Sequence, residues 1–568
     1  MGLVTLIVAA ASSTAAVIAA FAYPSVQRVL QRLAVASLAL ANLYAAFLLA
    51  TENTNFVLVV NFTRPGLSVV RRVMGLWGGS SGSLLFFTLV VGVVLTVAPV
   101  TGMRRALPSL VIATLSWTLV LVTFPFEQLA NQAIAGTGLS PILEHWAMII
   151  HPPLLYLGLA LSLVPAIAPS ASAKWQMSAL GTLTVALALG GFWAYEEVGW
   201  GGWWAWDPVE NVALIPWLLL AVTFHTKRGS ALPEWALALI WPTVFAGTAM
   251  TRTSLRTSVH SFANADGLGW ALWPLATTTC LAAVAIAVQN TTRPTRWRLR
   301  STFPGVMIFA IAVVVALGTF RPFLEGGTLG SFYTQYLFPV VVVGLMSIGI
   351  VPQLRTPAQN RSIAAAAIGA VAMAAFAGLT GWTEWWQFLL AAASGSALGA
   401  TLGGDLRSVR RVVAHIGVTL ILIGALGATA SVHQTVGLSA GASLNVSGHE
   451  IENLGSSFLG DDPPVIGAQI RVDGQTVLEP SLTVFIDRRL RLPEVATQRG
   501  LLEDVQVILQ SADDDGGVVI TVNSQPMTQF VWFGATLILV AMALPSRIRR
   551  TEQTTNETEK AEMAEVSE

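Results

Sequence analysis

The chain has 568 residues, of which 54% are hydrophobic and 11% charged, and its mean hydropathy is +0.66. Soluble domains contain about 45–50% apolar and about 25% charged residues, so this composition excludes a soluble protein and predicts an integral membrane protein. The formal net charge is zero, which gives no sign of a nucleic-acid partner.

Apolar stretches long enough to cross about 30 Å of hydrocarbon recur along the whole chain. We predict about fifteen transmembrane helices, and hence an all-α polytopic membrane protein. Residues 3–22 have the length of a signal peptide, but no Lys or Arg precedes them, so we interpret them as the first helix. The predicted spans are 3–22, 33–50, 84–102, 106–124, 150–168, 177–195, 208–225, 232–250, 268–289, 303–320, 334–352, 362–380, 385–402, 412–431 and 527–545.

Lys and Arg residues gather in alternate loops between these spans, which predicts that those loops face the cytoplasm. The N-terminus is then outside, and an odd number of helices puts the polar tail 547–568 inside, where its composition predicts disorder. The inner loops contain Arg28 and Arg32, Arg104 and Arg105, Lys227 and Arg228, and the arginine-rich segment 293–300.

Only one outer segment, 432–526, is long enough to form a domain. Its stretches VIGAQIRVDG, SLTVFIDRRLRL and VQVILQSADDDGGVVITV alternate β-branched residues and contain Gly and Asp turns. They predict a small, mostly antiparallel β-rich domain, which we interpret as a docking or scaffolding module because it has no obvious catalytic cluster. The helical bundle is expected over 1–431 and a final transmembrane helix over 527–546.

Four tryptophans and two glycines gather in the stretch WGGWWAWDPVEN, residues 200–211. An aromatic belt at the membrane interface accounts for one or two tryptophans per helix end, without glycines between them. We therefore favour a platform for a large planar ligand, with the glycines allowing close approach of the backbone. The platform residues are Trp200, Trp203, Trp204 and Trp206, with Trp193 and Tyr195 just before them.

The acidic residues of this stretch are interpreted structurally. Asp207 suits the N-cap of a helix, Pro208 its first position and Glu210 its third, which is a capping arrangement. Asp207 and Glu210 would then fix where the helix begins and hold the tryptophans in place.

Four of the seven histidines fall into two pairs by predicted depth. His151 begins a span at the outer face and His260 follows the outer end of another. His225 lies roughly 26 Å along its helix from Pro208, and His415 enters the membrane beside Arg410 and Arg411 on the same inner side. A single histidine near a helix end is often only hydrogen-bonded, but a pair at one depth fits the two axial ligands of a b-type haem. His145, His433 and His449 are interpreted as structural.

Beyond these residues, the sequence resembles the CcmF-type haem lyase family of system I cytochrome c maturation, one of the WWD-domain haem-handling proteins. The resemblance covers nearly the whole chain. It is carried by WGGSSGSLLF from Trp77, LSPILEHWAMIIHPPLLYLG from Leu139, the WWD region of about 190–217, TSVHSFA from Thr257, VAHIGVTLILIG from Val413 and FVWFGATLILVAMALP from Phe530. The chain departs from the family after Gly318, in TFRPFLEGG and GSFYTQY.

The resemblance implies that His151 and His260 ligate haem iron at the outer face, and that His225 and His415 hold a permanent haem b. It implies that haem is the transferred substrate, joined by thioether bonds to the CxxCH thiols of an apocytochrome c. It also implies a place in the inner membrane, a CcmE-like haem chaperone and CcmH/CcmI-like subunits as partners, and a quinol as reductant. For the haem propionates, Arg252 and Arg256 beside His260 are candidates because carboxylates pair with cations.

The sole cysteine, Cys280, lies inside an apolar stretch and is interpreted as a buried packing residue. It offers no disulfide and no CxxCH haem attachment site, which is consistent with a chain that acts on the thiols of another protein. A haem exporter or carrier without lyase activity stays open as an alternative. An ion or solute transporter predicts carboxylates in the middle of the membrane, and the sequence has no such pattern.

Overall fold

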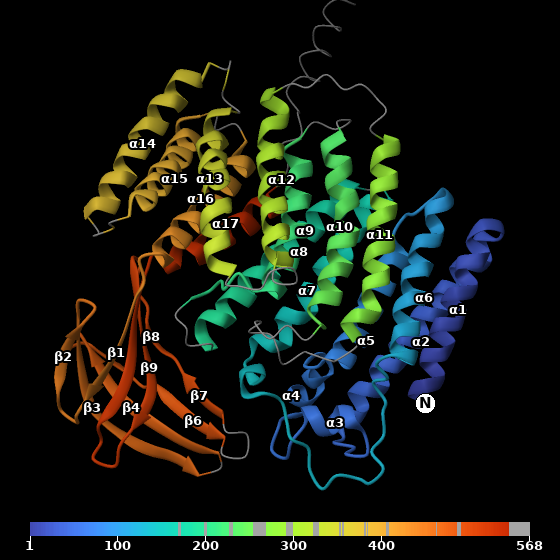
Figure 1. Cartoon of the computed structure of the whole chain (residues 1–568), viewed down its shortest axis with the longest axis horizontal. Helices are drawn as coiled ribbons and strands as arrows, with labels where there is room; N and C mark the ends of the chain where they lie inside the picture. The colour runs from blue at the N-terminus through green and yellow to red at the C-terminus, as the bar shows by residue number, and fades with distance from the viewer. Residues whose placement is uncertain are drawn as a thin grey trace, which may run out of the picture.

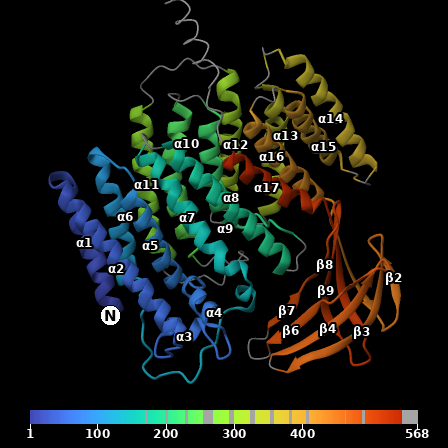
Figure 2. The same cartoon turned by 180° about the vertical axis from the view of Figure 1, so that it is seen from behind.

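The computed structural model describes residues 1–544 except 169–171, 198–201, 227–230, 254–267, 291–298, 322–328, 352–353, 355–356, 380–381, 383, 405–407, 462 and 486–489. Long helices stand side by side in a bundle, and a region of strands lies at the end where the first helix begins (Figures 1 and 2). The long helices are α1 (Gly2–Ala22), α2 (Pro24–Ala50), α5 (Ser80–Val97), α6 (Ala106–Leu121), α7 (Ala147–Ile167), α8 (Ser172–Glu197), α9 (Pro208–Phe224), α10 (Ala231–Met250), α11 (Leu268–Asn290), α12 (Leu299–Phe320), α13 (Leu329–Ile350), α14 (Gln359–Leu379), α15 (Trp385–Gly403), α16 (Val409–Ala428) and α17 (Thr528–Ala543).

Each predicted span coincides with one of these helices, so the prediction of a polytopic helical bundle is confirmed. Among the described residues, nine helices are long and apolar enough to cross a membrane, and four shorter apolar helices accompany them. The exact number of spans stays a prediction. The short helices α3 (Val57–Phe62) and α4 (Val69–Met74) were not predicted, because a six-residue helix shows too little periodicity.

Helix α2 begins well before its predicted start at residue 33. Pro24 occupies the first turn, where its missing N–H costs nothing. The polar Gln27 and Gln31 then lie in the helix and are buried, because Gln27 donates to Gln31 and to the carbonyl of Arg105. Paired amides of this kind enter an apolar bundle without an unsatisfied group.

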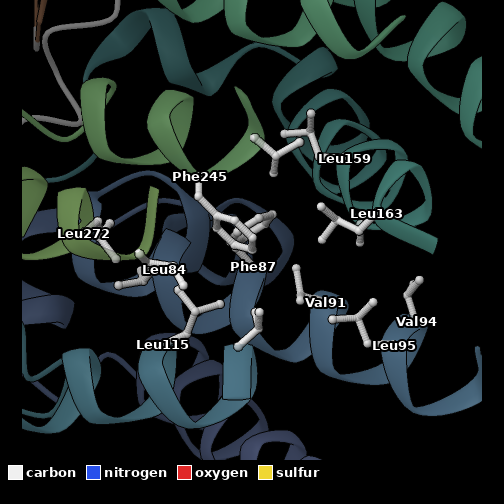
Figure 3. Packing of buried hydrophobic residues seen from close by; sticks show 14 of the residues in the cluster. Leu84, Phe87, Val91, Val94, Leu95, Leu115, Leu159, Leu163, Phe245 and Leu272 are labelled. Carbon is white, nitrogen blue, oxygen red and sulfur yellow. The ribbon is translucent and has the colours of Figure 1, made fainter. Parts of the chain in front are cut away.

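The main core lies between α5, α6, α7 and α10 (Figure 3). On α5 the apolar residues recur every three or four positions, which gathers them on one face of a helix. That face meets Leu115 of α6, Leu159 and Leu163 of α7, and Phe245 of α10. The α5 residues that form it are Leu84, Phe87, Val91, Val94 and Leu95, all at most 5% exposed.

Helices α16 and α17 approach each other closely through glycine. A Cβ atom on Gly417 would lie 2.7 Å from the carbonyl oxygen of Gly534, and one on Gly534 would lie 2.5 Å from that of Gly417. Small residues at such crossings let helix backbones touch, which is how helices associate where lipid supplies no hydrophobic force. The crossing fixes the part of α16 that begins two residues after His415.

The strands run from Val432 to Pro526, between α16 and α17, and every pair is antiparallel, as expected for the β-rich region. They form a four-stranded sheet in the order β1-β10-β9-β8 and a six-stranded sheet in the order β2-β3-β4-β6-β7, with β5 pairing with β4. The strands are β1 (Val432–Leu438), β2 (Ser443–Val446), β3 (His449–Asp461), β4 (Pro464–Val472), β5 (Thr476–Leu478), β6 (Ser481–Phe485), β7 (Leu490–Glu494), β8 (Ala496–Gln498), β9 (Glu503–Ala512) and β10 (Val518–Pro526).

Alternate residues of β9 and β10 form the core between the two sheets. Val505, Val507 and Leu509 are buried there with Ile520 and Val522. This two-residue period is the pattern that predicted strands from the sequence. The opposite face of the same strands carries polar residues, and near the bundle those residues are buried as well.

Candidate functional site

The tryptophan-rich segment ends in the capping box that the sequence predicts. The Asp207 carboxylate accepts from the backbone N–H of Val209 at 2.8 Å, and the Glu210 carboxylate accepts from the backbone N–H of Asp207 at 3.1 Å. Glu210 also accepts from the backbone N–H of Ala205. Two carboxylates therefore hold the backbone on either side of Trp206, which is the structural role expected of them.

Trp206 is held in an unusual backbone conformation. Its φ angle is +56°, a left-handed value that costs about 1–3 kcal/mol for a residue of this kind. The Asn211 side chain donates to the Trp206 carbonyl, and the indole stacks on the buried Tyr333 of α13 at 4.2 Å and 20°. The same Asn211 amide donates to the Tyr333 hydroxyl. Trp206 is thus anchored in the bundle.

The three described indoles of this segment do not form one flat surface. Trp203 and Trp204 are inclined by 55°, and Trp204 and Trp206 by 84°. A planar ligand can therefore lie flat against only one of them, with the others meeting it at an edge. Trp200 lies outside the described residues.

His151 is packed directly against α8. Its Nδ1 atom lies 2.8 Å from the carbonyl oxygen of Ala186, and since a carbonyl only accepts, Nδ1 carries the proton. A Cβ atom on Gly190 would lie 2.6 Å from Cε1 of the ring. Only glycine therefore allows this approach. Trp193, one turn further along α8, lies edge-on to the same imidazole at 6.0 Å.

The neighbouring Gly191 allows a close approach of Trp203 to α8. A Cβ atom there would lie 3.1 Å from the Trp203 carbonyl oxygen and 3.9 Å from the Trp532 ring of α17. Trp532 meets Trp203 edge-on at 6.5 Å. Adjacent glycines of α8 thus bring the outer histidine and the tryptophan-rich segment to one helix.

Three buried indole N–H groups have no hydrogen-bond partner among the described residues. They belong to Trp193, Trp203 and Trp204. A buried donor without an acceptor costs about 1–3 kcal/mol. An arrangement that leaves three such donors together is suited to a ligand with acceptor atoms.

His225 and His415 face each other at the other end of the bundle. Their ring centroids are 6.0 Å apart and the rings are inclined by 29°. Two imidazoles on one metal have centroids about 6.3 Å apart, because the bond is about 2.0–2.1 Å and the nitrogen lies about 1.1 Å from its ring centroid. The distance between the two ring centroids is therefore close to that of two imidazoles bound to one metal ion.

The two helices that carry His225 and His415, α9 and α16, pack against different neighbouring helices. Helix α9 packs on α8, α10 and α12, whereas α16 packs on α15 and α17. The Nδ1 of His225 lies 2.8 Å from the Ala221 carbonyl oxygen, so this nitrogen carries the proton and the lone pair resides on Nε2. A backbone carbonyl commonly orients a metal-binding imidazole in this way.

A family model described as "Cytochrome C assembly protein" matches residues 168–251. The curated relatives include the cytochrome c-type biogenesis protein CcmF of Pseudomonas fluorescens, 26% identical over 86% of this chain and 85% of its own length. Ccl1 of Rhodobacter capsulatus is 26% identical over 90% of this chain and 89% of its own length. A solved structure named cytochrome c heme lyase CcmF has the same fold, with a TM-score of 0.79 over 96% of this chain and 97% of its own, at 20% identity.

Over most of its length this chain is similar to CcmF-type cytochrome c-type biogenesis proteins. The stretch matched by the family model runs from the loop before α8 to the end of α10. It includes the glycines against His151 and Trp203, the capping box and His225. His415 and Trp532 come from helices outside the matched stretch.

Two of the expected site residues, His260 and Arg256, lie outside the described residues, so their placement stays a prediction. Arg252 is described and is 6% exposed. Its guanidinium donates to the Ser83 hydroxyl of α5 at 2.9 Å and to the Thr248 carbonyl at 3.3 Å.

Sequence reasoning missed three aromatic or polar neighbours of the site. His145, interpreted only as structural, stacks parallel to Trp193 at 6.3 Å and 9°. Tyr333 lies in the segment where the chain departs from the family, and Trp532 lies near the end of the chain. The motif EHWAMIIHPP, which contains both His145 and His151, was the one available signal for His145.

The strands are tied to the outer end of α8. The Tyr195 hydroxyl donates to the fully buried Asp504 carboxylate of β9 at 2.9 Å, and the Gln506 side chain donates to the Tyr195 carbonyl. Gln529 of α17 donates to the same carboxylate. Arg499 pairs with Glu196 and lies over the Phe192 ring at 5.4 Å. The β-rich region therefore contacts the helix that carries Trp193.

Proposed function

We propose that this chain is the core of a cytochrome c haem lyase, which positions haem at the outer face for attachment to an apocytochrome c. In that reaction the S–H of each CxxCH thiol adds across a haem vinyl group. A carbon–sulfur bond forms, the hydrogen goes to the second vinyl carbon, and no net oxidation occurs. The observation that carries the proposal is the His225–His415 pair, because a carrier of haem has no evident need for a second, permanent haem.

The inner pair fits a haem b. The centroid separation of 6.0 Å matches that of two imidazoles on one iron. His225 and His415 would ligate the iron, and the Ala221 carbonyl would keep the His225 ring in its ligating tautomer. A haem bound there supplies one-electron redox chemistry. A quinol is the reductant that we propose for it.

The outer residues act by positioning. His151 and His260 would ligate the iron of the substrate haem, and Trp200, Trp203, Trp204 and Trp206 with Trp193 would contact its ring. Thioether formation needs each thiol beside one particular vinyl group, so holding the correct face is the main contribution that a protein makes. The thiols come from the substrate. Cys280 was expected to be a buried packing residue, and that expectation is wrong, because Cys280 is exposed on α11.

The setting is the inner membrane, with the tryptophan-rich segment and the strands on the extracytoplasmic face. A CcmE-like haem chaperone and CcmH/CcmI-like subunits are the partners we propose. The alternative function is a haem exporter or carrier of the same family. It accounts for the outer histidines and the tryptophans, and it leaves the inner pair without a role.

The test is coexpression with a CxxCH apocytochrome in cells that lack their own maturation proteins of this family. The wild-type chain should give a reporter with covalent haem, and His151→Ala should abolish that haem. His433→Ala is a matched control, because His433 is a histidine of β1 whose side chain bonds to Asn523 of the neighbouring strand β10. Haem attachment that is unchanged in His151→Ala would reject the lyase assignment. Haem that leaves the cell without any attachment would favour the carrier.

A further inference from the structure

Arg252 is a buried cation without an acidic partner in the described part of the chain. Its acceptors are the Thr248 carbonyl and the hydroxyls of Thr251 and Ser83, all of which are neutral. Its Nε–H is buried and bonds to none of the described residues. The arginines Arg64, Arg72, Arg471 and Arg499 each have a carboxylate within ion-pair distance.

The difference between Arg252 and the ion-paired arginines matters for the free-energy cost of burying the charge. A charge taken out of water is expensive, and in proteins it is normally compensated by an opposite charge and by a full set of hydrogen bonds. The side chains of Arg64 and Arg499 are 37% and 50% exposed, so water reaches them. Arg252 is 6% exposed, and no carboxylate of the described residues pairs with it.

The first turn of α5 lies against this guanidinium. Gly79 is its N-cap and supplies no side-chain cap, so the first N–H groups of an 18-residue helix lack a side-chain acceptor there. Ser83 in this turn accepts from Arg252, and the Ser80 hydroxyl is buried without a partner. The positive end of the helix dipole thus adds to the positive guanidinium.

The sequence of this turn suits a close-fitting anion site. It lies in the motif WGGSSGSLLF, whose glycines allow the chain to fold back on itself. A Cβ atom on Gly82 would lie 2.1 Å from the Leu76 carbonyl oxygen. The Ser80 hydroxyl and the first backbone N–H groups of α5 can donate here, while Ser83 donates to the Ser80 carbonyl and accepts from Arg252. Arg252 adds a planar fork that matches a carboxylate.

We propose that Arg252 and the first turn of α5, with Ser80 and Ser83, form an anion site that takes a propionate carboxylate of the substrate haem. This rests on the proposed function and adds to it the element that fixes which edge of the haem enters the bundle. Tyr156 lies five residues after His151 on α7, about 7.5 Å along the helix, and its ring contacts Phe86 and Phe87 of α5, the helix that carries Ser83. A haem held at the outer histidines would then have its propionate edge directed toward the bundle and its vinyl edge toward the incoming thiols.

The test compares haem with its dimethyl ester, in which both carboxylates are neutral. Each is titrated into the purified full-length protein in detergent after the inner site has been filled, and binding is followed in the Soret band. The wild type should prefer the free acid by roughly 10–100-fold, the value of a hydrogen-bonded charge. In Arg252→Gln this preference should fall to about twofold or less, chiefly because the free acid binds more weakly.

Ser83→Ala is the second variant, since it keeps the cation and removes one hydroxyl, and it should reduce the preference several-fold. Arg71→Gln is the control, because Arg71 is an outer arginine whose side chain is 51% exposed, and it should keep the wild-type preference. Equal binding of both haems by the wild type would overturn the anion site and leave the lyase intact. If phosphate then raised the melting temperature of the wild type alone, the site would bind a small anion or a lipid phosphate, which also overturns the propionate assignment. No haem at the outer site of the wild type would instead reject the proposed function itself.

Discussion

Gly190→Ala should disable the outer histidine while leaving the bundle folded. The added Cβ would lie 2.6 Å from Cε1 of His151 and 3.1 Å from Nδ1, whereas carbon atoms rest at about 3.5–4.0 Å. The imidazole must therefore move by about 1 Å, which stretches its 2.8 Å bond to the Ala186 carbonyl beyond hydrogen-bond range. Overpacking of this kind costs about 1–3 kcal/mol, and a displacement of about 1 Å at a reacting group can reduce a rate by about 10²-fold.

The assay is the rate of covalent haem attachment to a CxxCH reporter, measured together with the melting temperature. Gly181→Ala on the same helix is the matched control, because its Cβ would meet only the flexible Met542 sulfur at 3.4 Å. Both substitutions gain about 1 kcal/mol of helix propensity, so the difference between them isolates the contact with His151. If Gly190→Ala attached haem as fast as Gly181→Ala, this reasoning about His151 would be refuted.

Three further outcomes are expected. The purified protein should show a low-spin b-type haem spectrum that is lost in His225→Ala and in His415→Ala and kept in His145→Ala; a colourless wild type from haem-replete cells would reject the inner site. Tyr195→Phe should lower the free energy of unfolding by about 1–3 kcal/mol, because the buried Asp504 loses a donor, and an unchanged melting temperature would contradict it. Burial opposes the charge of His449, but its hydrogen bond to Asp473 and the nearby Glu503 raise its pKa above the ordinary 6.5. Its stabilising effect should therefore be complete below pH 6.5 and disappear as the pH rises through the higher folded value. The difference in melting temperature between wild type and His449→Gln, followed against pH, measures this, and a difference that grew with pH would exclude it.

The sequence was a good guide to depth in the bundle. His225 and His415 could be paired because each lies beside a run of Lys and Arg, and such runs mark one interface of the membrane. The structure brings their rings to 6.0 Å. The capping box at Asp207 was equally predictable, because it depends on residues three positions apart and on nothing distant.

Rotation about the helix axis was not predictable in the same way. Helix α8 is apolar on nearly every side, so no polar face indicates which residues point at which neighbour. The contact of Gly190 with His151 and that of Gly191 with Trp203 depend on this rotation. Trp532 and Tyr333 were harder to predict because they lie far from the tryptophan-rich segment in the sequence. Tyr333, which stacks on Trp206, also lies in the part of the chain that departs from the family.

The rotation of α8 has a physical cause at its outer end. Between apolar helices in lipid, packing alone discriminates weakly among rotations, so polar contacts decide which is adopted. Tyr195 bonds to Asp504, which lies 309 residues further along the chain, and Glu196 pairs with Arg499. These bonds hold Tyr195 toward the strands, and Gly190 and Gly191, five and four residues earlier, then face His151 and Trp203. The β-rich region is in this way coupled to the geometry of the site. If α8 rotated about its axis, its bonds to the strands would break and His151 and Trp203 would lose their contacts with Gly190 and Gly191.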